Sequence, residues 1–276
     1  MGIWKLPFLK LAPAILACSA LGMLTGSCAI SSADTNAPST FRVMSYNIHH
    51  GEGLDGKVDL DRIAALIKKE GADIVALQEV DKGVERTKRR DLPAELAGLT
   101  GMTCIFSNNY GFQGGEYGNA VLTRFAVKSW TNTHYKMLRP GEQRGILQLR
   151  LDVRGREVIF MSTHIDHRPD DSERVLNTET MGQLVTNYSG TPILLCGDFN
   201  DVPGSRTYEK LAALFVDSWK VAGTGPGLTI PAERPNKRID YIWISRDSTI
   251  LPLKMWVPES QASDHLPIVA ELEFRR

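Results

Sequence analysis

The stretch Leu194-Leu195-Cys196-Gly197-Asp198-Phe199-Asn200 decides the fold of this chain. Its three apolar residues predict a short buried strand that ends at Gly197. Asp198 and Asn200 are two residues apart, so their side chains point the same way in an extended chain. A carboxylate can take a proton from water, and an amide beside it can hold an anionic oxygen. An Asp/Asn turn after a strand is the simpler alternative, and the other strand ends decide between the two.

Alternating and continuous apolar runs predict a protein that mixes strands and helices. We expect strands over residues 41–48, 73–80, 102–106, 118–124, 126–137, 146–153, 157–162, 216–219, 237–244 and 268–274. Amphipathic patterns with capping signals predict helices over residues 59–70, 92–99, 172–188 and 205–214. The stretch 107–118, rich in Gly, Asn and Tyr, predicts a loop suited to lining a pocket.

Carboxylates, amides and histidines recur at the predicted strand ends. They are Asn47, Glu79, Asn119, His164, Asp198, Asn200, Asp240, Asp264 and His265. A carboxylate buried among apolar residues needs a cation or another partner, as Glu79 and Asp240 do. Oxygen ligands dominate the set, which favours Mg²⁺ or Mn²⁺ as the metal. The adjacent His49 and His50 are expected to point apart on a strand, which argues against a metal that both bind.

Length and composition narrow the functional classes. The chain has 276 residues, of which 42% are hydrophobic and 23% charged, as in an ordinary globular protein. A core of this size needs no metal or disulfide for folding. The sequence lacks a Gly-x-Ser-x-Gly elbow, a P-loop and a dinucleotide fingerprint. Cys104 and Cys196 lie in strand-like runs, where one disulfide and two buried thiols are both open.

Residues 1–33 predict an export signal. A basic start leads into a short apolar run, and small residues follow. Cys28 after Gly-Ser resembles a bacterial lipoprotein cleavage site, and ordinary cleavage near Ala33 is the alternative. The polar residues 34–40 suit a tether to a catalytic domain over 41–276. We therefore expect a periplasmic, outer-membrane-anchored or extracellular protein, with Cys28 as the point of any membrane attachment.

Seven motifs follow the order found in the endonuclease/exonuclease/phosphatase superfamily, which includes deoxyribonuclease I and bacterial sphingomyelinases. They are Ser45-Tyr46-Asn47, Leu77-Gln78-Glu79, Gly118-Asn119-Ala120-Val121, Thr163-His164, Gly197-Asp198-Phe199-Asn200, Arg238-Ile239-Asp240-Tyr241 and Ser263-Asp264-His265. The chain resembles this family over residues 41–274. The resemblance implies an α/β (α+β) fold, a four-layer α/β/β/α sandwich of two mixed sheets packed face to face with helices outside. It also implies metal-dependent hydrolysis of phosphoesters.

The resemblance assigns the metal and the attacking water to one part of the set. It implies that Glu79 ligates Mg²⁺, with Mn²⁺ as the alternative, and that Asn47 and Asp264 lie close to the ion. Asp198 would activate or orient the attacking water. Asn200 would hold the phosphoryl group.

The same resemblance assigns the remaining polar residues to the phosphate and the leaving group. His265, oriented by Asp240, would bind the phosphate or act as a base. His164 would stabilise the phosphate or protonate the leaving oxygen. Polar residues beside these positions are the expected substrate contacts, namely Asn119, Asp166 and Arg86.

We therefore expect an exported, monomeric Mg²⁺-dependent phosphoesterase that hydrolyses a small or lipid-linked phosphodiester or phosphomonoester. A secreted nuclease on the same fold is one alternative. Without residues 1–33 the net charge is near −2, because that segment holds two lysines and no acid, so a nucleic acid is not favoured. A nuclease would need a local basic groove, such as one over residues 86–90. A binding protein without activity is the other alternative, and retention of every reactive motif argues against it.

Overall fold

The computed structural model describes residues 1–2 and 40–275 of the chain. Every helix and strand described below lies in the unit Pro38–Arg276. Beyond its first two residues, the predicted export signal lies outside the described residues, as do Cys28 and residues 34–39 of the predicted tether. Among the helices that the structure describes, none combines the length and the apolar character needed to cross a membrane.

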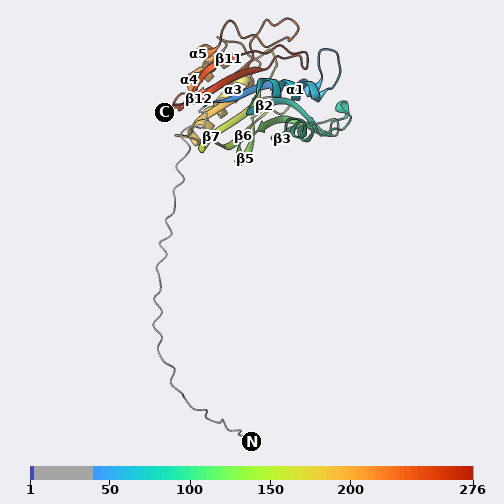
Figure 1. Cartoon of the computed structure of the whole chain (residues 1–276), viewed down its shortest axis with the longest axis vertical. Helices are drawn as coiled ribbons and strands as arrows, with labels where there is room; N and C mark the ends of the chain where they lie inside the picture. The colour runs from blue at the N-terminus through green and yellow to red at the C-terminus, as the bar shows by residue number, and fades with distance from the viewer. Residues whose placement is uncertain (3–39, 276) are drawn as a thin grey trace, which may run out of the picture. The chain divides into compact units, whose positions relative to one another are not determined.

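The described strands form two six-stranded sheets (Figure 1). The first sheet contains β1 (Thr40–Asn47), β2 (Ile74–Lys82), β3 (Thr103–Phe112), β4 (Gly115–Thr123), β11 (Ile250–Trp256) and β12 (Ile268–Phe274), in the order β11-β12-β1-β2-β4-β3. The second contains β5 (Ala126–His134), β6 (Gly145–Val153), β7 (Arg156–His164), β8 (Ile193–Asp198), β9 (Phe215–Asp217) and β10 (Asp240–Ser245), in the order β5-β6-β7-β8-β10-β9. Within them, β1 pairs parallel with β2 and β7 with β8, and the other pairs are antiparallel, so both sheets are mixed.

Three apolar clusters show how the layers pack. The largest lies between the sheets and contains side chains from both, such as Val43 and Phe160. The second joins the other face of the first sheet to α1 (Leu60–Glu70) and α2 (Leu92–Thr100). The third joins the other face of the second sheet to α3 (Ser172–Asn187) and α4 (Arg206–Leu214). This order of helix, sheet, sheet and helix confirms the predicted four-layer sandwich.

Local signals in the sequence account for the boundaries of helix α1. The side chain of Asp59 accepts a hydrogen bond from the backbone N–H of Asp61 at 3.0 Å, which caps the first turn. The helix stops at Gly71, whose φ of 65° is left-handed and is tolerated by glycine. The helix buries Leu60 and Ile63 against the first sheet, as its apolar periodicity predicts.

Strand β8 continues to Asp198, so the prediction that Gly197 ends this strand is wrong. A Cβ atom at position 197 would lie 2.0 Å from the carbonyl oxygen of Thr163. The backbones of β7 and β8 thus approach so closely that only glycine fits between them. Because the strand continues, Asp198 is held within the sheet rather than in a loop.

Three further predictions differ from the structure. The predicted loop 107–118 is mostly strand, since β3 extends to Phe112 and β4 begins at Gly115. Trp219 lies in the short helix α5 (Ser218–Ala222) and not in a strand. Strand β11 was not predicted. It contains Pro252, which a sheet tolerates in an edge strand because one row of backbone groups there is unpaired.

The two cysteines of the described domain are free thiols. Cys196 lies in the cluster between the sheets, whereas Cys104 packs against the cluster beneath α1 and α2. The first sheet therefore separates them, and of the two alternatives that the sequence leaves open the structure has two thiols.

Polar side chains link the two sheets near one end of the sandwich. Gln78 of β2 donates from Nε2 to Oγ of Ser162 on β7 at 3.3 Å. Asn119 of β4 donates from Nδ2 to the carbonyl oxygen of Gly145 on β6 at 3.0 Å. All four residues are buried, so these bonds hold one sheet against the other where the candidate site lies.

Candidate active site

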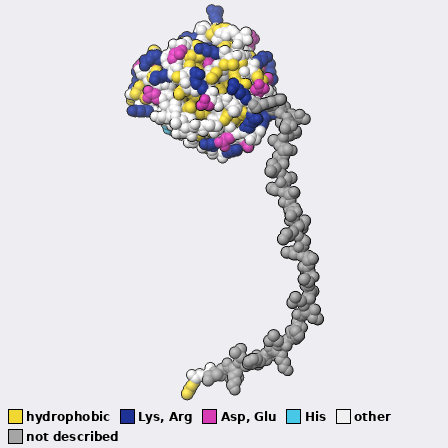
Figure 2. Space-filling model, turned by 90° about the vertical axis from the view of Figure 1, so that its left-hand side faces the viewer, with side chains coloured by type: hydrophobic (Ala, Val, Ile, Leu, Met, Phe, Trp, Pro, Cys, Tyr) yellow, Lys and Arg dark blue, Asp and Glu magenta, His cyan; other side chains and the backbone are white. Residues whose placement is uncertain are grey.

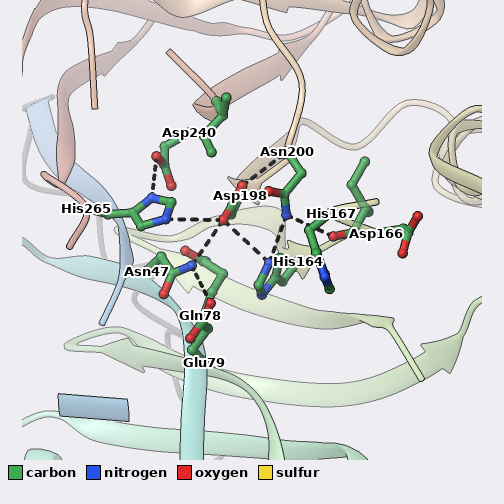
Figure 3. A network of polar contacts seen from close by, with 12 residues as sticks. Asn47, Gln78, Glu79, His164, Asp166, His167, Asp198, Asn200, Asp240 and His265 are labelled. Carbon is green, nitrogen blue, oxygen red and sulfur yellow. Dashed lines mark hydrogen bonds and ion pairs between the residues drawn. The ribbon is translucent and has the colours of Figure 1, made fainter. Parts of the chain in front are cut away.

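The register of the strands brings the predicted residues together. Strand β8 lies between β7 and β10, which places Asp198 opposite His164 on one side and opposite Asp240 on the other. In the facing sheet Asn47 pairs with Gln78, so Glu79 lies next to it. Figure 3 shows that these side chains converge from both sheets on the carboxylate of Asp198.

Asp198 is the centre of the hydrogen-bond network. Its Oδ2 accepts a hydrogen bond from Nδ2 of Asn47 at 3.0 Å, and its Oδ1 accepts one from the backbone N–H of Asn200 at 2.9 Å. The Nε2 atoms of His164 and His265 lie 3.4 and 3.7 Å from the same Oδ2. Three side chains and one backbone N–H thus surround this carboxylate, which is buried.

The environment of Asp198 favours a base near neutral pH. Burial, and then the charge of Asp240, raise the pKa of Asp198 to about 7, although His265 and the bonds from Asn200 and Asn47 lower it. A carboxylate with this pKa accepts a proton far more readily than one in water, and it is still largely ionised just above pH 7. The geometry therefore suits proton transfer from an attacking water.

His265 is the cationic neighbour of Asp198. Its Nδ1 lies 3.0 Å from Oδ2 of the buried Asp240, and its backbone N–H donates to Oγ of Ser263 at 3.2 Å. Burial lowers its pKa, but Asp240, Asp198 and Asp264 outweigh burial and raise the pKa of His265 to about 10. The imidazole is therefore protonated at neutral pH, so Nε2–H is a charged donor that can bind an anionic phosphate.

His164 is neutral and is oriented by Arg144, a residue that the sequence analysis missed. Burial, and then the charge of Arg144, lower the pKa of His164 well below its usual value. Nη1 of Arg144 lies 2.9 Å from Nδ1 of His164, and because a guanidinium can only donate, Nδ1 accepts. With Nδ1 as the acceptor, the proton of the neutral ring sits on Nε2 and faces Oδ2 of Asp198 at 3.4 Å. Nδ2 of Asn200 lies 3.0 Å from the same Nε2, and because an amide nitrogen also only donates, it competes with Arg144 for the one lone pair of the ring.

Arg144 is a buried cation with an unusual number of partners. Its Nη2 forms an ion pair with Oε2 of Glu142 at 2.7 Å and lies 3.3 Å from Nδ1 of His167. Tyr117 and Glu79 are close enough to favour its charged form. The sequence pattern did not predict this role, because a single arginine before a strand is usually exposed.

Glu79 lies within strand β2 and not at its end. The pairing of β2 with β4 shifts between Leu77 and Val80, and φ of Glu79 is 58° at this irregularity. Its Oε1 accepts a hydrogen bond from Nδ2 of Asn47 at 3.0 Å, so one amide joins Glu79 to Asp198. The bulge turns the carboxylate out of the strand pattern and towards the site.

The histidines after β1 do not point apart, so that prediction is wrong. The chain forms the short 3₁₀ turn η1 (His49–Gly51), in which the two ring centroids are 4.4 Å apart. One ligand atom from each of His49, His50 and Glu79 lies within 4.8 Å of the other two. Oδ1 of Asp264 lies 3.9 Å from Nδ1 of His49, which places a further carboxylate at this side of the site. Carboxylates, an amide and imidazoles together form a donor set for a divalent cation.

Three predicted substrate contacts lie outside the network around Asp198. The amide nitrogen of Asn119 is bonded to the backbone of β6. Asp166 accepts from Nε of Arg168 at 2.7 Å, and Figure 3 shows its carboxylate pointing away from Asp198. Arg86 forms two hydrogen bonds with the buried Asp81, at 2.8 and 2.9 Å.

Comparisons with known proteins identify the family of this chain. Protein YbhP of Escherichia coli K12 is 28% identical over 251 residues, which are 85% of this chain and 97% of YbhP. The 5′-tyrosyl-DNA phosphodiesterase of Caenorhabditis elegans is 27% identical over 194 residues, which are 66% of this chain and 48% of that protein. The solved structure of the Bacteroides thetaiotaomicron mannosyl-6-phosphatase covers 85% of this chain and all of its own, with 19% identity and a TM-score of 0.71.

A model of the endonuclease/exonuclease/phosphatase family matches residues 44–265. The chain therefore belongs to this family, whose members are phosphoester hydrolases.

Proposed function

We propose that the protein is an exported, divalent-metal-dependent phosphoesterase that hydrolyses a small or lipid-linked phosphoester by in-line attack of water. One observation carries the proposal. The buried carboxylate of Asp198, with a pKa raised to about 7, shares the amide of Asn47 with Glu79 and faces the charged imidazole of His265. A base, a metal-binding carboxylate and an anion-binding cation therefore meet at one point.

Asp198 acts as the base in this mechanism. Its Oδ2 accepts a proton from the attacking water, while the backbone N–H of Asn200 holds Oδ1 at 2.9 Å and fixes the plane of the carboxylate. Asn47 keeps the same Oδ2 in place through its 3.0 Å hydrogen bond. Fixed geometry of this kind lowers the entropic cost of bringing water and phosphate together.

The donor set around Glu79 fits a divalent cation. Oε1 of Glu79 is held by Asn47, and Asp264 and His49 lie on the same side of the site. A bound Mg²⁺ or Mn²⁺ would polarise the phosphoryl oxygens and stabilise the leaving group. Glu79, Asn47 and Asp264 would hold it.

The protonated imidazole of His265 and the amide of Asn200 bind the phosphoryl oxygens as negative charge develops on them. His265 is held for this by Asp240, through the 3.0 Å contact between Nδ1 and Oδ2. In the tautomer in which Nδ1 of His164 accepts from Arg144, Nε2–H can donate to the leaving oxygen. These donors are placed before substrate binds, so the transition state needs little reorganisation.

The relatives support an ester of phosphoric acid and leave its type open. The Caenorhabditis relative is a phosphodiesterase and the Bacteroides structure is that of a phosphatase. Substrates of both types carry a phosphoryl group that would lie beside Asp198 and His265. We propose a small or lipid-linked substrate because the mature chain carries no basic excess.

A substrate panel assayed with and without EDTA tests the reaction. We expect Mg²⁺ or Mn²⁺ to support hydrolysis of bis-p-nitrophenyl phosphate, and the Glu79→Ala variant to lose it. Glu209→Gln is the matched control, since this exposed acid lies in α4 and should leave the rate unchanged. A Glu79→Ala protein that hydrolyses the substrate at the wild-type rate contradicts the mechanism.

Export is proposed from the N-terminal sequence alone. The basic start, the apolar run and Cys28 support it. Fractionation of a bacterial host that expresses the full chain should recover activity outside the cytoplasm, and Cys28→Ser should release any membrane-bound fraction. Activity that stays in the cytoplasmic fraction for both proteins contradicts export.

A nuclease is the second candidate, and one cavity favours it. The cavity measures about 390 Å³, and four cations, Lys57, Arg86, Lys88 and Arg90, line it together with Glu52. Arg86 and Arg90 are paired with Asp81 and Glu95, so much of this charge is neutralised. Figure 2 shows acidic and basic side chains mixed over one face of the domain. Plasmid nicking that Mg²⁺ supports and salt suppresses would establish this function, and no nicking at any Mg²⁺ concentration would exclude it.

A further inference from the structure

The turn after β1 brings two imidazoles close to Glu79. The rings of His49 and His50 are 4.4 Å apart and meet at 66°. One ligand atom of each imidazole and one carboxylate oxygen of Glu79 lie within 4.8 Å of one another. Bonds of about 2.0–2.2 Å to nitrogen and oxygen place the ligand atoms of one ion less than about 4.5 Å apart. The 4.8 Å limit is slightly wider, so a small closure of the three side chains brings them within reach of one ion.

The backbone is strained at each of these three residues. The φ angles are 45° for His49, 45° for His50 and 58° for Glu79, all in the left-handed region. A left-handed conformation costs a residue with a Cβ atom about 1 kcal/mol or more. The backbone N–H of His49 donates to Oδ1 of Asn47 at 3.1 Å and holds the start of the turn. These three residues come from the turn η1 and from strand β2, and their side chains meet. Asn200, on the Asp198 side of the site, also has a left-handed φ, of 48°.

The ring of His50 has a buried nitrogen with no partner among the described residues. His50 is 7% exposed, and its Nδ1 makes no hydrogen bond there. Its other nitrogen, Nε2, faces Oε2 of Glu52 at 3.5 Å. An unpaired polar atom in the interior costs about 1–3 kcal/mol, which a bound ligand would remove.

A carboxylate lies beside each of the two rings. Glu52 lies beside Nε2 of His50, and Asp264 lies beside Nδ1 of His49 at 3.9 Å. In metal sites a carboxylate on one ring nitrogen orients the imidazole and makes the other nitrogen a better ligand. The nitrogens that do not face these carboxylates are Nδ1 of His50, which has no hydrogen-bond partner among the described residues, and Nε2 of His49.

We propose that His49, His50 and Glu79 form a cation position that takes a transition ion of the Zn²⁺ class in preference to Mg²⁺. Mg²⁺ selects oxygen ligands, whereas imidazole suits zinc and its neighbours in the first transition row. The position shares Glu79 with the oxygen ligands Asn47 and Asp264. The inference therefore rests on the proposed function, which puts a metal ion at Glu79. It adds imidazole nitrogens as ligands and a preference for a transition ion over Mg²⁺.

The test measures metal binding and not turnover. The full chain is stripped with EDTA and titrated calorimetrically with Zn²⁺ and separately with Mg²⁺, and Co²⁺ serves as a visible-absorption probe of the ligands. We compare wild type with His49→Asn and His50→Asn. The matched control is His134→Asn, because His134 is an exposed histidine on β5 whose ring contacts only the backbone of Asn108.

We expect each of the two variants to weaken Zn²⁺ binding by about tenfold or more. Mg²⁺ binding should change by less than about threefold, and the Co²⁺ absorption should lose its imidazole character. His49 is partly exposed, so its replacement tests the site without opening the core. Thermal melts of the metal-free proteins identify any variant whose binding loss is a loss of folding.

Two results would overturn the proposal. One is Zn²⁺ affinity equal to wild type in both variants, and the other is an equal loss in His134→Asn. The proposed function is tested separately by Glu79→Gln, which removes the ligand common to both positions. If Glu79→Gln alone loses Mg²⁺ binding and neither histidine variant loses Zn²⁺ binding, the phosphoesterase proposal stands and the proposed imidazole position is wrong. If Zn²⁺ binding depends on His49 and His50 but the protein has no hydrolytic activity, the cation position stands and the phosphoesterase proposal is wrong.

Discussion

The two sides of the active site differ in how they are built. On one side, Asp198, His265 and Asp240 lie in or beside regular strands, are buried, and contact one another at 3.0 to 3.7 Å. On the other side, Glu79 and His49 have left-handed backbones, and the contacts of His49 with its neighbours are longer. The first side is a network of mutual contacts in which Oδ1 of Asp240 has no hydrogen-bond partner among the described residues, whereas on the second side Nδ1 of His50 has none.

This difference indicates which side needs a ligand to be complete. A buried network whose side chains contact one another is rigid, and rigidity is what proton transfer and charge stabilisation require. A strained set of donors with an unpaired imidazole nitrogen is expected to gain most from binding a cation. The predictions below test this contrast, beginning with the largest effect.

Removing the base should have the largest effect. Asp198→Asn keeps the size of the side chain but cannot accept a proton, so we expect kcat to fall by about 10³-fold. The affinity for Mg²⁺ should stay within a factor of about three, because Glu79 and its partners are untouched. Steady-state kinetics and calorimetry measure both. A variant that loses the metal along with activity would show that the two sides are not separate.

The pH dependence of kcat/KM should show two limbs. Asp198 must be ionised to act as a base, so the rate should fall about tenfold per pH unit below its pKa of about 7. His265 must be protonated to bind the phosphate, so the rate should fall again above its pKa of about 10. A profile that is flat from pH 5 to 8 would remove Asp198 from the mechanism.

Removing the partner of His265 should have a smaller effect. In Asp240→Asn the imidazole loses the charge that raises its pKa, and we expect the upper limb to move to lower pH by more than one unit. The rate at pH 7 should fall by about tenfold to a hundredfold. Asp217→Asn is unsuitable as a control because Asp217 pairs with the buried Arg238, so the exposed Glu209→Gln is used. An unchanged upper limb would show that Asp240 has only a structural role.

Arg144 should contribute least of the residues named here. Arg144→Lys keeps a positive charge but cannot contact His164 and His167 together, so the tautomer of His164 in which Nδ1 accepts is less favoured. We expect kcat to fall by about tenfold, with a larger loss for substrates that have poor leaving groups. Comparing p-nitrophenyl and alkyl phosphoesters measures the difference. Equal losses for both would indicate that Arg144 does not act through His164.

The regular parts of the molecule could be predicted from the sequence. The boundaries of α1 follow from Asp59, Gly71 and the apolar face between them, and the four-layer order follows from the family motifs. Residues on straight strands, such as Asp198 and His164, were found because a strand carries its last side chains to one end of the sheet.

The parts that could not be predicted depend on irregular backbone or on contacts between distant segments. A period of two placed His49 and His50 on opposite faces, but the left-handed turn η1 brings the rings together. The bulge at Glu79 leaves no signal in the pattern of residues. Arg144 was missed because its burial is decided by His164 and Tyr117, which lie in other strands.

The bond from Asn47 to both Glu79 and Asp198 has a consequence for the interior of the molecule. One carboxylate belongs to each sheet, so the distance between Glu79 and Asp198 depends on how the two sheets pack. Side chains such as Leu149 and Phe160 fill the apolar layer between the sheets. Truncating them should therefore shift the two carboxylates relative to each other and slow the enzyme even where the fold survives.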